Sequence, residues 1–212
     1  MKKVWVMLVV MALAATPAMA AGIRNTKHDL SQSSQSGGKT GTIGQICVYC
    51  HTPHGGASAN GAPLWNRSTT NINISKVYNT STLNAAPNAT SVEATDAILC
   101  LSCHDGASLT KPLTNPPNAG GNVPTTNITG SALIGTDLSN DHPIGFVYDD
   151  ALVNNDKELE SVTNVQNALG TDVFFGAGKN EMWCSSCHDV HNDTYKPFLR
   201  ISNANSKLCL SC

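Results

Sequence analysis

The residues best suited to chemistry in this chain are its eight cysteines, all of which fall in pairs separated by two residues. In three pairs a histidine follows directly, which gives CVYCH at 47–51, CLSCH at 100–104 and CSSCH at 184–188. This pattern is the signature of c-type haem attachment: two thiols bond to vinyl groups of the porphyrin and the adjacent imidazole binds the iron. The predicted haem-binding cysteines are Cys47, Cys50, Cys100, Cys103, Cys184, Cys187, Cys209 and Cys212, and the predicted proximal ligands are His51, His104 and His188.

Other sites also use paired cysteines. Eight cysteines in an exported protein suggest a disulfide framework, and a single CxxC pair also fits a zinc ribbon or a redox-active dithiol. A zinc site needs four ligands that converge from two pairs, and it gives the adjacent histidines no role. The three CxxCH motifs therefore favour haem over zinc, disulfides and dithiol chemistry.

The fourth pair, Cys209 and Cys212, has no histidine after it in the printed sequence. Residues 208–212 (LCLSC) repeat residues 99–103 letter for letter. We therefore expect the native chain to continue with a histidine and predict a fourth covalently attached haem c. The alternative is a natural terminus with a dithiol that carries no haem.

Four further histidines match the four faces that the proximal ligands leave open. The chain has seven histidines, and the four that remain are His28, His54, His142 and His191. The only methionine outside the N-terminal segment is Met182, two residues before a haem cysteine and poorly placed to reach a distal face. We predict two histidine ligands at every iron, which leaves no open position for a substrate. The expected protein is thus an electron-transfer protein without catalytic residues.

The order of these histidines shows an internal duplication. Residues from about 21 to 106 contain an upstream histidine, a CxxCHxxH motif and a CLSC motif, and residues from about 141 to 212 repeat this order. The second histidines of the CxxCHxxH motifs, His54 and His191, cannot reach the iron of their own motif, because three residues do not wrap around a porphyrin edge. Each must serve a different haem, which would bring two porphyrins close together.

The N-terminus indicates the compartment. Two lysines, an apolar run over 4–15 and the small residues Ala18-Met19-Ala20 predict a secretory signal peptide over 1–20. A membrane-spanning helix fits less well, because the apolar run is short and Pro17 follows it. No cysteine follows the cleavage site, so a lipoprotein anchor is not expected. No later segment is long and apolar enough to span a bilayer, so no other membrane anchor is expected. The predicted location is extracellular or on the outer cell surface, with the periplasm as the alternative.

The composition predicts an unusual interior. Aromatic residues make up only 5% and charged residues 13% of the chain, and Asn, Thr, Ser and Gly are frequent over 66–90 and 111–140. Such a chain buries little apolar area of its own. We therefore expect a mostly irregular, loop-rich fold with a few short helices, one domain over 21–212 wrapped around stacked covalently bound haems. The net charge of −2 has no basic patch, so nucleic acid is not an expected partner.

Two segments show a helical pattern. Residues 156–169 begin with acids, place apolar residues on one face and precede Gly170, which predicts a helix. Residues 91–103 predict a second helix that carries the second haem motif in its last turn.

Several segments resemble a known family. HDLS at 28–31, ICVYCHTPHG at 46–55, APLWNR at 62–67, LCLSCHDG at 99–106, DHPIGF at 141–146 and CSSCHDVH at 184–191 resemble the doubled-CxxCH multihaem cytochromes of metal-respiring bacteria. The resemblance covers nearly the whole mature chain and departs from the family pattern only in the absent terminal histidine. It implies head-to-tail polymerisation into a filament, electron transport to external acceptors or other redox proteins, and an axial histidine donated to a neighbouring subunit.

Three functions remain for comparison. The first is a subunit of an extracellular conducting filament, the second is a periplasmic monomeric shuttle, and the third is a multihaem reductase of a small oxyanion. The reductase needs an open axial position, which the number of histidines does not leave. For the filament, His54 is the expected donor to the next subunit, and His28 is the rival.

Overall fold

The structure is a computed structural model that describes residues 22–59 and 61–212, so the predicted signal peptide lies outside the described residues. The regular elements are short and are joined by long loops, which confirms the loop-rich fold class with a few short helices. The helices are η1 (Cys47–Tyr49), α1 (Ala89–Glu93), α2 (Ala97–His104), η2 (Gly130–Ala132), α3 (Asp150–Asp156), α4 (Val162–Leu169), α5 (Cys184–Cys187), η3 (Ala204–Ser206) and η4 (Cys209–Ser211). The strands are β1 (Ala57–Ala59), β2 (Ala62–Trp65), β3 (Lys76–Val77), β4 (Asp137–Leu138), β5 (Phe146–Val147) and β6 (Glu181–Met182).

The strands form three separate two-stranded sheets rather than one layer. β1 pairs with β2 and β5 with β6 in antiparallel fashion, whereas β3 and β4 are parallel. Two-stranded pairs of this length have little stability of their own, so they depend on the packing around them.

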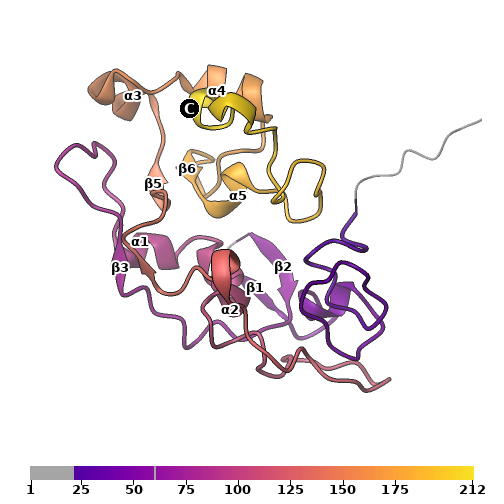
Figure 1. Ribbon diagram of the computed structural model, residues 1–212. Coiled ribbons are helices and arrows are strands. Elements are labelled where there is room, and N and C mark those ends of the chain that lie inside the picture. The colour runs from indigo at the N-terminus through magenta and orange to yellow at the C-terminus, as the bar shows by residue number, and fades with distance from the viewer. Residues whose placement is uncertain (1–21, 60) are drawn as a thin grey trace, which may run out of the picture.

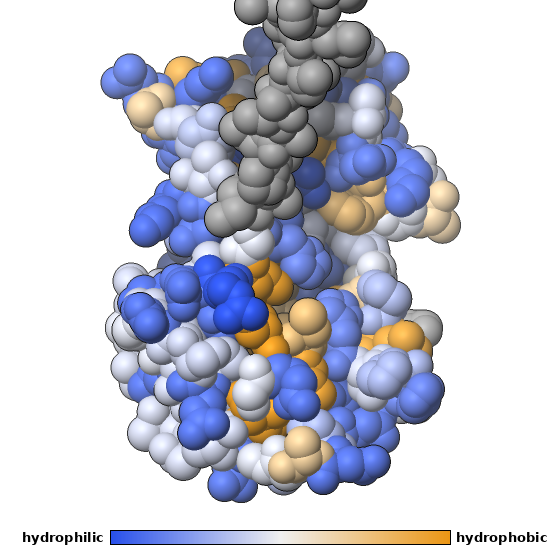
Figure 2. All heavy atoms as spheres, turned by 90° about the vertical axis from the view of Figure 1, so that its right-hand side faces the viewer, coloured by the Kyte–Doolittle hydropathy of each residue, from blue (hydrophilic) through white to orange (hydrophobic). Residues whose placement is uncertain are grey.

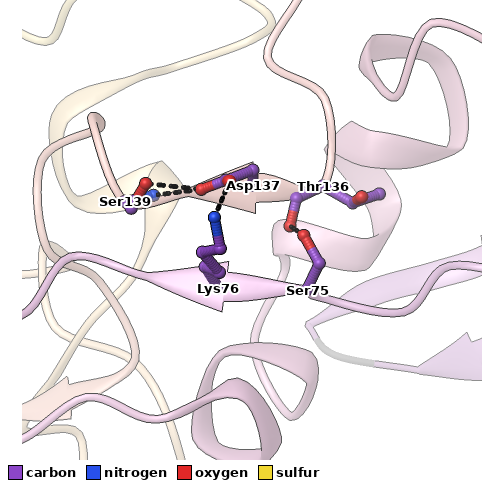
Figure 3. Close-up of polar contacts among 5 residues, drawn as sticks. All are labelled: Ser75, Lys76, Thr136, Asp137 and Ser139. Carbon is purple, nitrogen blue, oxygen red and sulfur yellow. Dashed lines mark hydrogen bonds and ion pairs between the residues drawn. The ribbon is translucent and has the colours of Figure 1, made fainter.

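The parallel pair joins segments that are 61 residues apart in the sequence. The Lys76 ammonium lies 3.0 Å from a carboxylate oxygen of Asp137, and the hydroxyl of Ser75 donates to the carbonyl of Thr136 at 2.9 Å (Figure 3). The backbone N–H and the hydroxyl of Ser139 also donate to Asp137, at 3.1 and 2.5 Å. These bonds hold residues 75–76, which follow β2, against residues 136–139, which precede the second half of the chain.

The helix predicted over 156–169 is wrong in its first part. Asp156 is the last residue of α3, which ends because Lys157 adopts a left-handed conformation with φ of 72°. A new helix, α4, begins at Val162 after Ser161, whose side chain accepts from the N–H of Asn164. The C-terminal end is as predicted: α4 stops at Leu169, and Gly170 follows with φ of 106°.

The helix predicted over 91–103 is also interrupted. α1 ends at Glu93, and the hydroxyl of Thr95 donates to the carbonyl of Val92 and accepts from the N–H of Ala97. This local bonding competes with the helical pattern. The second helix, α2, carries Cys100 and Cys103 as predicted.

The interior consists of three small apolar clusters, not one core. Each cluster borders cysteines of the haem motifs. The first cluster is formed by Leu30, Ile43, Tyr49, Leu109 and Leu113 and borders Cys50 and Cys103. The middle cluster is formed by Ile72, Ile74, Val92, Ala97, Leu101 and Leu138 and borders Cys184. The third cluster is formed by Tyr148, Val165, Leu169, Val173, Phe174, Met182 and Leu208 and borders Cys187 and Cys212.

Figure 1 shows the two halves of the chain one above the other. Elements α3 to η4 lie in the upper half, and η1 to α2 lie in the lower half. Among residues 22–59 and 61–212, no helix is long and apolar enough to cross a membrane.

Candidate haem-binding sites

Each cysteine pair lies on one helical turn, which places both thiols on the same side of the backbone. α2 and α5 each contain a whole pair, whereas η1 and η4 each begin with the first cysteine of a pair and are followed directly by the second, Cys50 and Cys212. At the first motif the N–H groups of Cys50 and His51 donate to the carbonyl of Cys47, at 3.1 and 2.8 Å. Residues three and four apart on a helix are neighbours. The turn therefore points two thiols and the following imidazole to one side, as covalent attachment of a porphyrin requires.

The three predicted proximal histidines share one polar contact. In each of them Nδ1 lies at hydrogen-bond distance from a backbone carbonyl oxygen. The pairs are His51 with Pro63 at 2.8 Å, His104 with Ala132 at 2.7 Å and His188 with Pro197 at 3.0 Å. A carbonyl oxygen only accepts, so Nδ1 carries the proton and Nε2 keeps its lone pair for a metal. Metal-binding histidines are oriented by such outer bonds.

Two of the predicted distal histidines lie opposite proximal ones. The ring centroids of His51 and His191 are 6.3 Å apart, and those of His28 and His104 are 6.1 Å apart. A metal–imidazole bond is about 2.0 Å long, so two imidazoles on opposite sides of one iron place their centroids about 6 Å apart. The two separations therefore fit an iron with two histidine ligands.

The pairing with His191 crosses the internal duplication. His191 belongs to the second repeat and His51 to the first, so the second histidine of one CxxCHxxH motif lies opposite the proximal histidine of the other. The two imidazole planes are close to parallel, at 19°, whereas the planes of His28 and His104 are inclined at 73°. The two repeats thus each contribute one imidazole to this facing pair.

His28 is held between the halves of the molecule. Its ring stacks on Phe198 with a centroid separation of 4.2 Å. Burial, together with the nearby His104 and His188, lowers the pKa of His28 to about 4, against a hydrogen bond with the backbone of Val190 and the charge of Asp193. Its imidazole is therefore neutral at pH 7, which is the form that binds a metal.

The structure does not place the other two predicted distal histidines opposite an imidazole. His54 and His142 are both exposed. Nδ1 of His142 lies 2.8 Å from the carbonyl oxygen of Pro143, while the carbonyl of His54 accepts from Thr52 and Asn115. Within the described residues, the ring contacts of the histidines involve neither of these two side chains.

Six of the eight thiols belong to half-buried cysteines, whereas Cys47 and Cys209 are exposed. Burial raises the pKa of Cys50 to about 12 and that of Cys212 to about 11. Redox-active CxxC thiols have lowered pKa values, so the dithiol alternative finds no support here. All eight cysteines are free of disulfides. Across residues 22–59 and 61–212, no three His, Cys, Asp or Glu side chains gather into a site for a single metal ion.

Consecutive motifs adjoin one another along the chain. In each pair of consecutive motifs, a thiol of one motif lies close enough to a thiol of the other to raise the pKa of that thiol. In addition, the first and third apolar clusters each border cysteines of two motifs. The neighbouring thiols are Cys50 and Cys103, Cys100 and Cys184, and Cys187 and Cys212. On the face drawn in Figure 2, an apolar band lies between hydrophilic side chains in the lower half.

A comparison with protein families matches the C-terminal part of the chain. A family described as the doubled CXXCH motif matches residues 176–212, which contain the third and fourth cysteine pairs. The match supports a multihaem c-type cytochrome. Such a protein binds haem and transfers electrons. No curated protein matches the chain.

Two charged residues near the motifs were missed by the sequence analysis. Arg67 and Asp96 are buried, and each lies between consecutive motifs. Arg67 belongs to the APLWNR segment, which makes it recognisable in the sequence. Arginine is rarely buried without partners, so a buried Arg67 indicates a specific role. Asp96 has no comparable signal beyond its place before the second motif.

Proposed function

We propose that this protein transfers electrons through four covalently bound c-type haems, each with two histidine ligands. The observation that carries the proposal is the pair of imidazole separations, 6.3 and 6.1 Å, because they match one iron between two histidines. Covalent haem would supply one-electron chemistry at the iron. The eight cysteines would hold the porphyrins, and the seven histidines would serve as axial ligands.

The residues of the chain perform three tasks in this proposal. The helical turn at each motif holds two thiols toward one porphyrin edge. The carbonyls of Pro63, Ala132 and Pro197 fix the tautomer of the proximal imidazoles. His191 and His28 would supply the second imidazole at these two haems, and a substrate would then find no free position at either iron. The contacts between consecutive motifs favour transfer from one haem to the next.

We further propose that the protein is an extracellular subunit of a head-to-tail filament. The motif order resembles that of OmcE, the outer-surface tetrahaem cytochrome of Geobacter that forms filaments. His28 lies opposite His104 of its own chain, which argues against its being the shared ligand. His54 is exposed and too close in sequence to serve its own haem, so it is the proposed donor to the next subunit. The filament would pass respiratory electrons to external acceptors or to other redox proteins.

The number of haems is tested by the intact mass of the secreted holoprotein. The expected mass includes four haems, and it falls by one haem in a variant with Cys209→Ala and Cys212→Ala. A wild-type mass with three haems would refute the fourth site. The matched Cys47→Ala and Cys50→Ala variant shows how the loss of a single haem registers.

The assembly is tested by electron microscopy of the wild type and of His54→Ala. We expect wild-type filaments, and we expect the variant to retain four haems, lose the filaments and gain one high-spin iron. Pro53→Ala, at the exposed neighbouring residue, is the control and should polymerise normally. Filaments from His54→Ala would reject this bridge, and a monomeric wild type would favour the periplasmic shuttle.

A further inference from the structure

Arg67 is a buried cation with no carboxylate partner among the described residues. Its side chain is 4% exposed. Nε donates to the carbonyl of Ser102 at 3.3 Å, and Nη2 lies at 2.7, 2.8 and 3.5 Å from the carbonyls of Ser108, Leu109 and Lys111. Nη1 is buried without a hydrogen-bond partner. Backbone carbonyls solvate the guanidinium, but they do not neutralise its charge.

The position of Arg67 is between the first and second haem motifs. The preceding residue, Asn66, donates from its backbone N–H to Cys50 at 2.8 Å and from its side chain to Val48 at 2.7 Å. Arg67 itself binds Ser102, inside the second motif. Burial raises the pKa of both Cys50 and Cys103, and the positive charge of Arg67 opposes that rise at both thiols. The electric field of Arg67 therefore reaches one thiol of the first motif and one thiol of the second.

Asp96 is the opposite charge at the next junction. It is 6% exposed and lies directly before α2, which carries the second motif. Its carboxylate accepts from the N–H of Cys184 at 3.0 Å and from the N–H of Ser185 at 2.9 Å, and also from the hydroxyl of Ser185. Burial raises the pKa of Asp96, while these hydrogen bonds, in which the carboxylate only accepts, oppose that rise and favour the ionised form. No cation pairs with Asp96 in the described part of the chain.

A buried charge without a counter-charge acts strongly on a nearby redox centre. Reduction adds one negative charge to the iron site, so a fixed cation favours the reduced state and a fixed anion favours the oxidised state. The effect is large where the dielectric constant is low. Arg200, whose Nε donates to Ser185 at 2.7 Å, is only half-buried, and solvent screens its opposing effect near the third motif.

We propose that Arg67 and Asp96 set a step in reduction potential along the protein. Arg67 holds the haems of the first and second motifs at higher potential, and Asp96 holds the haem of the third motif at lower potential. Electrons are then drawn from the third motif toward the first. This inference rests on the proposed haem function and names the residues that tune it.

The test is an optical redox titration of the purified holoprotein. In Arg67→Met the high-potential end of the titration moves to lower potential, and in Asp96→Asn the low-potential end moves to higher potential. The double variant titrates over a narrower range than the wild type. Arg67→Lys keeps the charge, so its titration stays close to that of the wild type. Arg24→Met and Asp172→Asn, at exposed positions, are the charge-matched controls and leave the titration unchanged.

A purely structural role gives a different result. The two residues lie at opposite ends of α2: Asp96 directly precedes the helix, and Arg67 donates to Ser102 in its last turn. An acid at the N-terminus and a cation at the C-terminus also stabilise a helix. If both variants carry four low-spin haems and melt earlier but titrate like the wild type, the proposal is overturned. If one variant fails to bind four haems, the redox titration of the other variant still tests the proposal. Haem number and spin state, measured on the same samples, test the proposed function separately.

Discussion

At the scale of single residues, the same arrangement recurs around three imidazoles. A backbone carbonyl holds Nδ1 of His51, His104 and His188, at distances of 2.7 to 3.0 Å. The three carbonyls come from different settings: Pro63 lies in β2, Ala132 ends η2, and Pro197 lies in a turn outside the helices and strands. The shared hydrogen bond, and not a shared element, therefore orients the imidazoles.

His191→Ala tests the pairing across the two repeats. The holoprotein should keep four haems, because no cysteine changes, but the iron bound by His51 should become high-spin and bind carbon monoxide when reduced. Electron paramagnetic resonance and carbon monoxide difference spectra measure both effects. Val190→Ala, at the exposed neighbouring residue, is the control. A fully low-spin His191→Ala protein would show that His191 is not this ligand.

The residue types and spacing predict the cysteines and the proximal histidines without the fold, because haem attachment is encoded in five consecutive residues. The partners of His28 and His191 depend on contacts between segments 76 and 140 residues apart, which spacing alone does not determine. The burial of Arg67 and Asp96 likewise becomes visible only when the motifs are side by side.

At the scale of elements, local bonds divide two predicted helices into four. Lys157 in a left-handed conformation ends α3, and Thr95 redirects the chain after α1. The hydrophobic pattern was read correctly for α4, where Val165 and Leu169 are buried. The hydrophobic pattern does not reveal that one residue, Lys157, has a positive φ. It therefore does not predict the boundary between α3 and α4.

Ser161→Ala should destabilise α4 by about 1 kcal/mol, because the side chain satisfies the N–H of Asn164 at the start of that helix. Thermal unfolding of the holoprotein measures the loss. Ser161→Asp is the matched control, since it keeps an acceptor at the cap. An equal loss in both variants would show that the cap is not the cause.

The β3–β4 contact should show a pH dependence. Hydrogen bonds from Ser139 and Lys76 lower the pKa of Asp137 to about 2, below the usual value of 3.8. Because the folded-state pKa is depressed, the stabilisation is present above about pH 4 and is lost as the pH falls toward 2. Asp137→Asn should therefore melt slightly earlier than the wild type at pH 7 and equally at pH 2. The same difference at both pH values would contradict this origin.

At the scale of the whole molecule, the three apolar clusters are small and separate, and each one borders haem cysteines. Such clusters bury too little area to offset the entropy of ordering loops of this length. The prediction that porphyrins complete the interior therefore follows from composition and from packing alike.

The fold should then depend on haem attachment. Chain produced without the haem-attachment machinery is expected to have the circular dichroism of a disordered protein and no cooperative melting transition. The holoprotein from the same expression host, with that machinery, is the control. A compact apoprotein that unfolds cooperatively would show that the polypeptide builds its interior alone.

The central claim is that every iron is bound by two histidines. Quantitative electron paramagnetic resonance of the oxidised full-length holoprotein tests it most directly. We expect four low-spin ferric haems per chain. A high-spin ferric signal that amounts to one iron or more per chain would contradict it and would point instead to an open site, as in a reductase.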